Sequence, residues 1–244
     1  PLVAAFTATA TPEVRQDIIR RLDIPGASIV CTGFDRPNLH FAVQRTRDKD
    51  RSLLEFLRKH DKQCGVIYCA TRSKVESVTQ QLQRHGFKAL RYHAGLTPEE
   101  RRNNQNAFVG GLVPLIVATN AFGMGIDKAD VRFVVHYNMP KDVESYYQEA
   151  GRAGRDGLES ECLLLYDKAD IAVNTYLIGH DQPDLAWKAH EMELLQKMTF
   201  YCNTSGCLRR VLLEYFGEKA PAKCNHCGNC DANKNASWRR FLDL

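Results

Sequence analysis

Two arginines three residues apart, Arg152 and Arg155, have the clearest potential for chemistry in this chain. Each directly follows a glycine, and the acidic residues beside them are Glu149 and Asp156. An arginine presents a planar, permanently charged fork that matches the geometry of phosphate. Beside a transferring phosphoryl group, such a side chain stabilises the charge that spreads over the phosphate oxygens. The pair therefore predicts phosphate chemistry, and the plainer alternative for an Arg-x-x-Arg sequence is a basic surface turn.

A second candidate site is formed by four of the nine cysteines, Cys207, Cys224, Cys227 and Cys230. A Cys-x2-Cys-x2-Cys turn can wrap three thiolates round one ion, and a cysteine at the start of a helix completes a tetrahedron. Zinc suits four thiolates, an iron–sulfur cluster is chemically possible, and disulfides are disfavoured in a cytosolic chain. Cys202 and His226 are the rival ligands. Because protein would fill all four positions, we expect the zinc to be structural and to fold a small helical subdomain.

Alternating strands and helices must position these residues. Apolar, β-branched runs predict buried strands at 66–69, 89–93, 115–119, 131–137 and 162–166. Helical periodicity predicts helices at 71–85 and 98–108, with Thr71 or Ser73 and Thr97 available as N-caps. This alternation indicates an α/β fold with a parallel sheet and helices on both faces. The motifs at 69–72, 93–96 and 119–127 follow strands, where ligands of such sheets bind.

The composition is that of a globular protein, with 44% hydrophobic and 25% charged residues. A net charge of +4 means that any nucleic-acid footprint must be local. We expect a cytoplasmic protein, because no apolar run reaches the roughly eighteen residues of a membrane span and no signal peptide opens the chain. The start at Pro1 suggests a chain cut from a larger one. The sequence contains no Gly-x-x-x-x-Gly-Lys-Ser/Thr loop to cradle nucleotide phosphates.

The run YYQEAGRAGRDGL at 146–158 resembles the last motor motif of superfamily 2 helicases, in the form carried by the RecQ family of DNA helicases. Gln148 stands where many relatives in that superfamily have histidine. Further matches follow the family's order: FTATAT at 6–11, FDRPN at 34–38, VIYCATR at 66–72, YHAGL at 92–96 and ATNAFGMGIDK at 118–128. The family also has a zinc-binding module of this cysteine spacing just after its motor.

The resemblance implies a RecA-like second motor lobe of an enzyme that hydrolyses ATP with Mg²⁺ and unwinds DNA in the 3′-to-5′ direction. It implies that Arg155 is the arginine finger and Arg152 its support, although the sequence does not order the two. Gln148 would relay between nucleotide and arginines, and Gly125 and Asp127 would approach the nucleotide. The implied contacts to the DNA backbone are Thr71, Arg72, His93, Gly95 and Thr119.

Four segments are expected on this basis. Residues 1–46 form the end of a first motor lobe and the connection between lobes, and 47–180 form the second lobe. Residues 181–234 form the helical zinc-binding subdomain, with helices at 184–201 and 204–216, and 235–244 form a C-terminal tail. Without the first lobe in the same chain, we expect no ATP turnover. The alternatives are an RNA helicase or translocase with the same motor, and a zinc-stabilised DNA-binding module without enzymatic activity, gripping single-stranded or duplex DNA.

Overall fold

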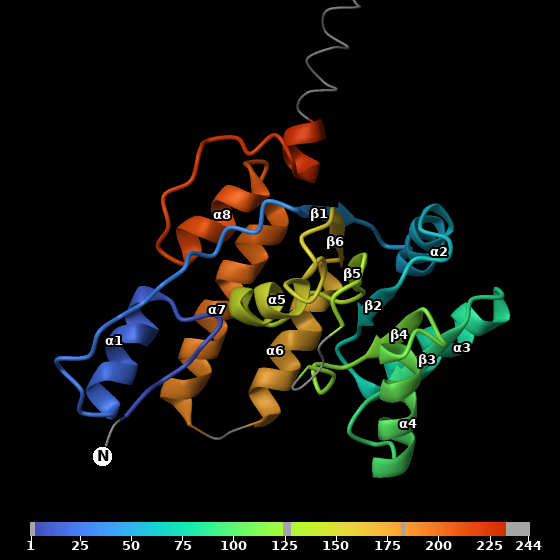
Figure 1. Ribbon diagram of the computed structural model, residues 1–244, viewed down its shortest axis with the longest axis horizontal. Coiled ribbons are helices and arrows are strands. Elements are labelled where there is room, and N and C mark those ends of the chain that lie inside the picture. Colours follow the sequence, from blue (N-terminus) through green and yellow to red (C-terminus); the bar gives the residue numbers. More distant parts are fainter. Residues whose placement is uncertain (1–2, 124–127, 182–183, 233–244) are drawn as a thin grey trace, which may run out of the picture. The chain divides into compact units, whose positions relative to one another are not determined.

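The computed structural model describes residues 3–123, 128–181 and 184–232 (Figure 1). The chain divides into two compact units. One unit is Asn38–Asn203, and the other combines Pro1–Pro37 with Thr204–Leu244. In the described part of the chain, none of the helices is long and apolar enough to cross a membrane.

The larger unit is built on a six-stranded sheet in the order β1-β6-β5-β2-β4-β3, with every neighbouring pair parallel. Its strands are β1 (Leu39–Arg45), β2 (Gly65–Tyr68), β3 (Ala89–Tyr92), β4 (Leu115–Ala118), β5 (Phe133–His136) and β6 (Ser160–Tyr166). Every residue of the central strands β2, β4 and β5 is buried. Such continuous burial is expected of parallel strands that are covered on both faces.

Helices cover both faces of this sheet. The helices of the unit are α2 (Lys49–Lys59), α3 (Arg72–Arg84), α4 (Pro98–Val109), α5 (Val143–Ala150), α6 (Ala169–Asp181) and α7 (Leu185–Asn203). One core packs α2 and α3, through residues such as Leu53 and Val78, on Ile67 and Val135 of the sheet. On the opposite face, α5 covers His136, the residue after Val135 in β5, because successive strand residues point to opposite faces. The sequence prediction of an α/β fold with two covered faces is confirmed.

Capping residues mark where the helices begin. Thr71 accepts a hydrogen bond from the backbone N–H of Lys74 and caps α3, and Thr97 caps α4 by accepting from Glu100. Asp142 does the same for α5, with its carboxylate 2.6 Å from the backbone nitrogen of Ser145. Each cap satisfies a backbone N–H that the first turn leaves unpaired, so the polar residue after each strand fixes where the next helix starts.

The boundaries of the two compact units differ from the segment boundaries expected from the sequence. The segment boundary expected after residue 46 follows β1, whose seven residues pair with β6 and so belong to the sheet. The boundary expected after residue 180 precedes α7, which remains in the larger unit and places Tyr201 against Tyr146 of α5, with ring centroids 5.1 Å apart. Aromatic packing and strand pairing therefore extend the α/β unit at both ends.

The smaller unit contains α1 (Pro12–Arg21), α8 (Leu208–Tyr215) and the cysteine-rich turn. The segment from Phe34 to Pro37 lies along α8: the ring of Phe34 stacks on Phe216 at 4.5 Å, and Arg209 forms an ion pair with Asp35 at 2.6 Å. The helix ends at Tyr215 with Phe216 as its C-cap, and Gly217 follows with a φ of +81°, a left-handed conformation that glycine adopts without strain. The predicted stop at Gly217 is confirmed.

Candidate functional site

The two arginines lie on a loop, residues 151–158, that begins where α5 ends. Backbone hydrogen bonds join this arginine loop to the segment before β5, from Gly154 N–H to Val131 at 2.9 Å and from Asp156 N–H to Ala129 at 3.3 Å. The guanidinium of Arg132 also binds both carboxylate oxygens of Asp156 at 2.6 Å. These hydrogen bonds from Arg132 hold the pKa of Asp156 below its ordinary value of 3.8. The loop is therefore tied to the sheet on both sides of Arg155.

The two arginines have different environments. Arg152 is half-buried, and its Nη1 donates to the carbonyl oxygen of Gly123 at 2.7 Å. A Cβ at residue 123 would lie 2.6 Å from Nη2 of Arg152, so a side chain there would displace the guanidinium from this position. Arg155 is exposed. The geometry makes Arg152 the residue that packs against the turn after β4, and it presents Arg155 to solvent.

The acidic residues next to the arginines have other partners. Glu149 binds Nε2 of the buried His136 at 2.9 Å, and Asp156 binds Arg132. The phenol of Tyr68, next to His136, has a raised pKa because it is buried, and the charges of Arg152 and Arg155 oppose that rise. The positive charge of the arginine loop therefore acts on the pKa of a buried tyrosine in the larger unit.

Gln148, the predicted relay, is exposed on α5, one turn before the arginines. The other two predicted nucleotide contacts, Gly125 and Asp127, lie outside the described residues.

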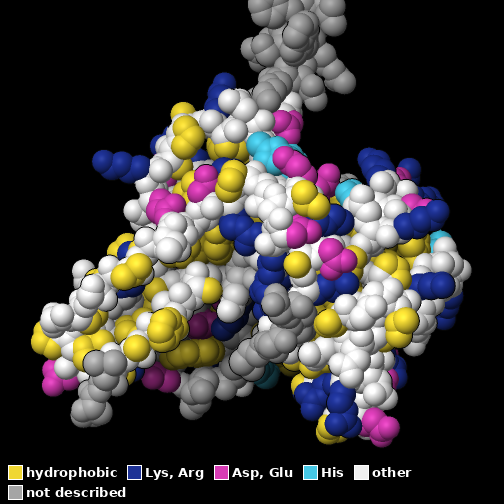
Figure 2. All heavy atoms as spheres, in the orientation of Figure 1, with side chains coloured by type: hydrophobic (Ala, Val, Ile, Leu, Met, Phe, Trp, Pro, Cys, Tyr) yellow, Lys and Arg dark blue, Asp and Glu magenta, His cyan; other side chains and the backbone are white. Residues whose placement is uncertain are grey.

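The predicted nucleic-acid contacts follow β2, β3 and β4, which are neighbours in the sheet. Parallel strands bring their carboxyl ends to one edge, so these residues share that edge. Thr71 is half-buried as the α3 cap, Arg72 is exposed, and Thr119 is mostly buried and accepts from Ala121 N–H at 3.4 Å. Figure 2 shows Lys and Arg side chains over the region of α3 and α4.

His93 and Gly95 form a self-contained turn after β3. The Nδ1 of His93 lies 3.2 Å from the backbone nitrogen of Gly95, and its Nε2 lies 2.8 Å from the carboxylate of Glu76. The Gly95 N–H donates to Nδ1, so Nε2 carries the proton that binds Glu76. With its side chain 6% exposed, His93 positions the turn. A Cβ at residue 95 would lie 3.4 Å from Cδ of Arg72, which places this turn beside an exposed arginine.

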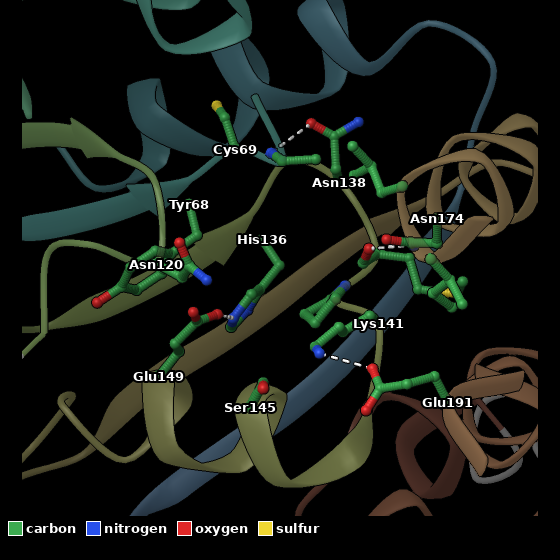
Figure 3. Close-up of a pocket in the computed structure, with 15 residues that line it drawn as sticks. Tyr68, Cys69, Asn120, His136, Asn138, Lys141, Ser145, Glu149, Asn174 and Glu191 are labelled. Carbon is green, nitrogen blue, oxygen red and sulfur yellow. Dashed lines mark hydrogen bonds and ion pairs between the residues drawn. The ribbon is translucent and has the colours of Figure 1, made fainter. Parts of the chain in front are cut away.

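A polar cavity of about 250 Å³ lies beyond the ends of β2 and β5, and sequence reasoning missed it (Figure 3). His136 and Glu149, in contact at 2.9 Å, line one part of it, and Lys141 forms an ion pair with Glu191 at 2.6 Å. Asn138 contributes its side-chain oxygen to the backbone N–H of Ala70 at 3.2 Å. The signal available in the sequence was the pair of polar residues Asn138 and Lys141, which follows a buried strand.

The four predicted metal ligands converge in the smaller unit. The sulfur atoms of Cys207, Cys224, Cys227 and Cys230 all lie within 4.8 Å of one another. Two of the separations, Cys207–Cys227 and Cys224–Cys230, are 4.0 Å. Tetrahedral zinc with Zn–S bonds of about 2.3 Å requires sulfurs about 3.8 Å apart, so the cluster fits one ion.

Local structure explains this convergence. Cys207 is the N-cap residue of α8, and its sulfur accepts the backbone N–H of Cys224 at 3.3 Å. Asn225 adopts a left-handed φ of 56°, which turns the chain between two ligands, and the N–H of His226 points at the Cys224 sulfur at 3.3 Å. Backbone donors of this kind stabilise thiolates. The rivals Cys202 and His226 are not members of the metal-ligand group found among the described residues.

These features define a class of protein: an α/β lobe with an exposed arginine loop, followed in the chain by a four-cysteine cluster that fits one metal ion. Residues 48–157 match the family model described as helicase conserved C-terminal domain, and residues 168–231 match the model described as RecQ zinc-binding. The ATP-dependent DNA helicase RecQ of Bacillus subtilis is 46% identical over 97% of this chain and 40% of its own length. That of Pasteurella multocida is 41% identical over 93% of this chain and 36% of its own length.

The chain therefore belongs to the RecQ helicase family. It spans about 40% of the length of the relative from B. subtilis. Among solved structures, S. cerevisiae Dbp5 bound to RNA and ADP BeF3 matches with a TM-score of 0.60 and 21% identity, covering 79% of this chain and 54% of that chain. At that identity the match concerns the fold, and it supports a RecA-like lobe.

Proposed function

We propose that this chain forms the second motor lobe and zinc module of an ATP-dependent DNA helicase that moves 3′ to 5′ along single-stranded DNA and separates duplexes. The observation that carries the proposal is the arginine loop. It presents Arg155 to solvent while Gly154 and Asp156, on either side, are hydrogen-bonded to the segment before β5. A finger must be both exposed and fixed in place to stabilise a phosphoryl group that another lobe holds.

In this proposal Arg155 is the finger and Arg152 supports the turn on which it stands. Gln148 relays between nucleotide and arginines, and Gly125 and Asp127 complete the nucleotide contacts. ATP and Mg²⁺ would be held mainly by a first motor lobe in the same full-length chain, because this sequence has no phosphate-cradling Gly-Lys-Ser/Thr loop. When bound, Mg²⁺ neutralises charge on the phosphates.

Single-stranded DNA would run along the edge where β2, β3 and β4 end. Thr71, Arg72 and Thr119 offer hydroxyls and a guanidinium for phosphates, and His93 sets the shape of the turn that carries Gly95. Contacts of this type follow the backbone without reading sequence. A motor that acts on DNA in this way would work in the cytoplasm, on the nucleoid if the source is bacterial.

The module with Cys207, Cys224, Cys227 and Cys230 would hold one structural zinc. All four ligands come from protein, which leaves no open position for catalysis.

The test is ATP hydrolysis with single-stranded DNA, measured on the full-length protein, on this chain alone, and on this chain with a RecQ-type first lobe added. We expect turnover from the full-length protein, none from this chain alone, and partial recovery with the added lobe. Arg155→Ala in the full-length protein should lower kcat by about 10³-fold or more, as expected of an arginine finger. Arg58→Ala, an exposed arginine in the last turn of α2, is the matched control.

Two outcomes would contradict the proposal. Turnover by this chain alone would reveal a phosphate site outside the arginine loop. Full activity of Arg155→Ala would show that Arg155 is not the arginine finger.

Duplexes with 3′ or 5′ single-stranded tails test the direction, and equal stimulation by RNA would favour an RNA helicase. Salt-sensitive DNA binding without turnover in the full-length protein would favour a non-enzymatic binding module.

A further inference from the structure

Among the described residues, the side chain of Asn38 contacts the arginine loop from more than a hundred residues away in the sequence. Its Nδ2 donates to the carbonyl oxygen of Gly154 at 2.8 Å and to that of Leu158 at 2.9 Å. A side-chain amide has two N–H donors, so both are used on this one loop. The two acceptors stand before and after Arg155, and a single side chain thereby closes the loop.

The position of Asn38 is itself fixed by the sheet. Its carbonyl oxygen accepts from the backbone N–H of Ser160 at 3.0 Å, and the next residue, Leu39, begins the β1–β6 pairing opposite Ser160. Asn38 is half-buried, and its hydrogen bond to Gly154 is partly shielded from water. Because backbone pairing with Ser160 holds Asn38 in place, its side-chain hydrogen bonds fix the position of a loop that is neither helix nor strand.

The backbone of the loop is closely packed at this contact. Gly154, the residue before Arg155, has a φ of +57°, and a Cβ there would lie 2.5 Å from Nδ2 of Asn38 and 2.8 Å from the carbonyl oxygen of Leu158. On the other side of Arg155, Asp156 is held by Arg132 at 2.6 Å. The backbone of Arg155 thus lies between two fixed neighbours, and Asn38 is the side chain that fixes the first.

We infer that Asn38 is a positioning residue for the arginine finger, an inference that rests on the proposed function of Arg155. Asn38 acts on the carbonyl groups of the loop and sets where the guanidinium of Arg155 stands. We expect Asn38 to have little effect on the affinity for ATP. Misplacement of a catalytic group by about 1 Å costs up to about 100-fold in rate, so the loss of both hydrogen bonds should appear in kcat.

The experiment uses the full-length protein and steady-state ATP hydrolysis with saturating single-stranded DNA. Asn38→Ala should lower kcat about 10- to 100-fold with little change in the KM for ATP. Asn38→Asp keeps the shape but turns a donor into an acceptor that faces two carbonyl oxygens, so its loss should be larger. Asn103→Ala, an exposed asparagine on α4, should behave as wild type.

A double-mutant cycle separates positioning from general damage. In the Arg155→Ala background, Asn38→Ala should change the remaining rate by less than about twofold, because its route to the reaction has been removed. Zinc content and Tm are measured for every variant.

The inference is overturned if folded Asn38→Ala keeps the wild-type kcat, or if its loss is undiminished in the Arg155→Ala background. It is also overturned if both Asn38 variants unfold below the assay temperature, since Asn38 would then serve the fold as a whole. Failure of the proposed function itself looks different: Arg155→Ala alone would retain full activity, whatever Asn38 does.

Discussion

The ion pair between Lys49 and Asp170 gives the sharpest test of the packing described above. The Nζ of Lys49 lies 2.6 Å from the carboxylate, and the two side chains are 9% and 5% exposed. The same Nζ donates to the carbonyl oxygen of Tyr137 at 2.9 Å. Asp170 also accepts from Nδ2 of Asn138 at 3.0 Å and from the backbone N–H of Asp167 at 3.2 Å. The pair joins the first turn of α2 to the first turn of α6.

Replacing one partner leaves the other charge buried without its counterion. Lys49→Met keeps most of the apolar stem, so the loss is mainly electrostatic, and breaking a buried pair in this way costs about 3–5 kcal/mol. We expect a value near the lower end, about 3 kcal/mol, because Asn138 and Asp167 still donate to the carboxylate. The double variant Lys49→Met/Asp170→Leu removes both charges and should be more stable than Lys49→Met alone.

Equilibrium urea unfolding followed by far-UV circular dichroism measures these differences at constant zinc concentration. Arg51→Ala is the control, because Arg51 forms an ion pair with Glu55 whose side chains are 76% and 51% exposed, and we expect little change there. The reasoning is refuted if Lys49→Met is no more destabilising than Arg51→Ala. It is also refuted if adding Asp170→Leu to Lys49→Met lowers the free energy of unfolding by as much again.

Three further predictions concern the loop, the metal and pH. Gly154→Ala should destabilise the chain by about 2 kcal/mol more than Gly157→Ala, since both have a positive φ but only Gly154 is crowded, and thermal unfolding compares them. A strong chelator should release one zinc per chain with loss of helical signal, and Cys227→Ser should reduce the zinc content measured by mass spectrometry. Glu161→Gln should cost about 0.5 kcal/mol at pH 6 and less at pH 9. The pKa of His60 is raised above its ordinary 6.5, first by the neighbouring carboxylate of Glu161, which lies 3.6 Å from Nε2. This stability is therefore complete below pH 6.5 and is lost as the pH rises through the raised pKa, and urea unfolding at the two pH values decides.

The sequence predicted well those elements whose signal is local. The strands β2, β4 and β5 are short apolar runs buried on both faces, so their composition alone marks them. The cysteine cluster was predicted because three of its ligands lie within seven residues, a spacing that a single turn can close. Thr71 and Thr97 were identified as caps because a capping residue stands next to the helix it begins.

Features that depend on distant pairing could not be read in the same way. The strand β1 was assigned to a connection, because polar residues such as His40 and Gln44 interrupt its apolar pattern and its partner β6 lies more than a hundred residues later. The hydrogen bond between His136 and Glu149 could be predicted only by knowing that α5 returns across β5. Likewise, the sequence places Asn38 in the FDRPN motif without showing that its amide reaches the arginine loop.

The pairing of the first strand with the last has a consequence for how the protein is made. Leu39 meets Ser160 in the sheet, a separation of 121 residues (160 − 39), and at about 5–20 residues per second a ribosome needs roughly 6–24 seconds to synthesise that interval. During this time β1, with Leu39 and Phe41, has emerged without its partner and presents unpaired backbone groups beside apolar side chains. The six-stranded sheet is thus completed only once Tyr166 has left the ribosome.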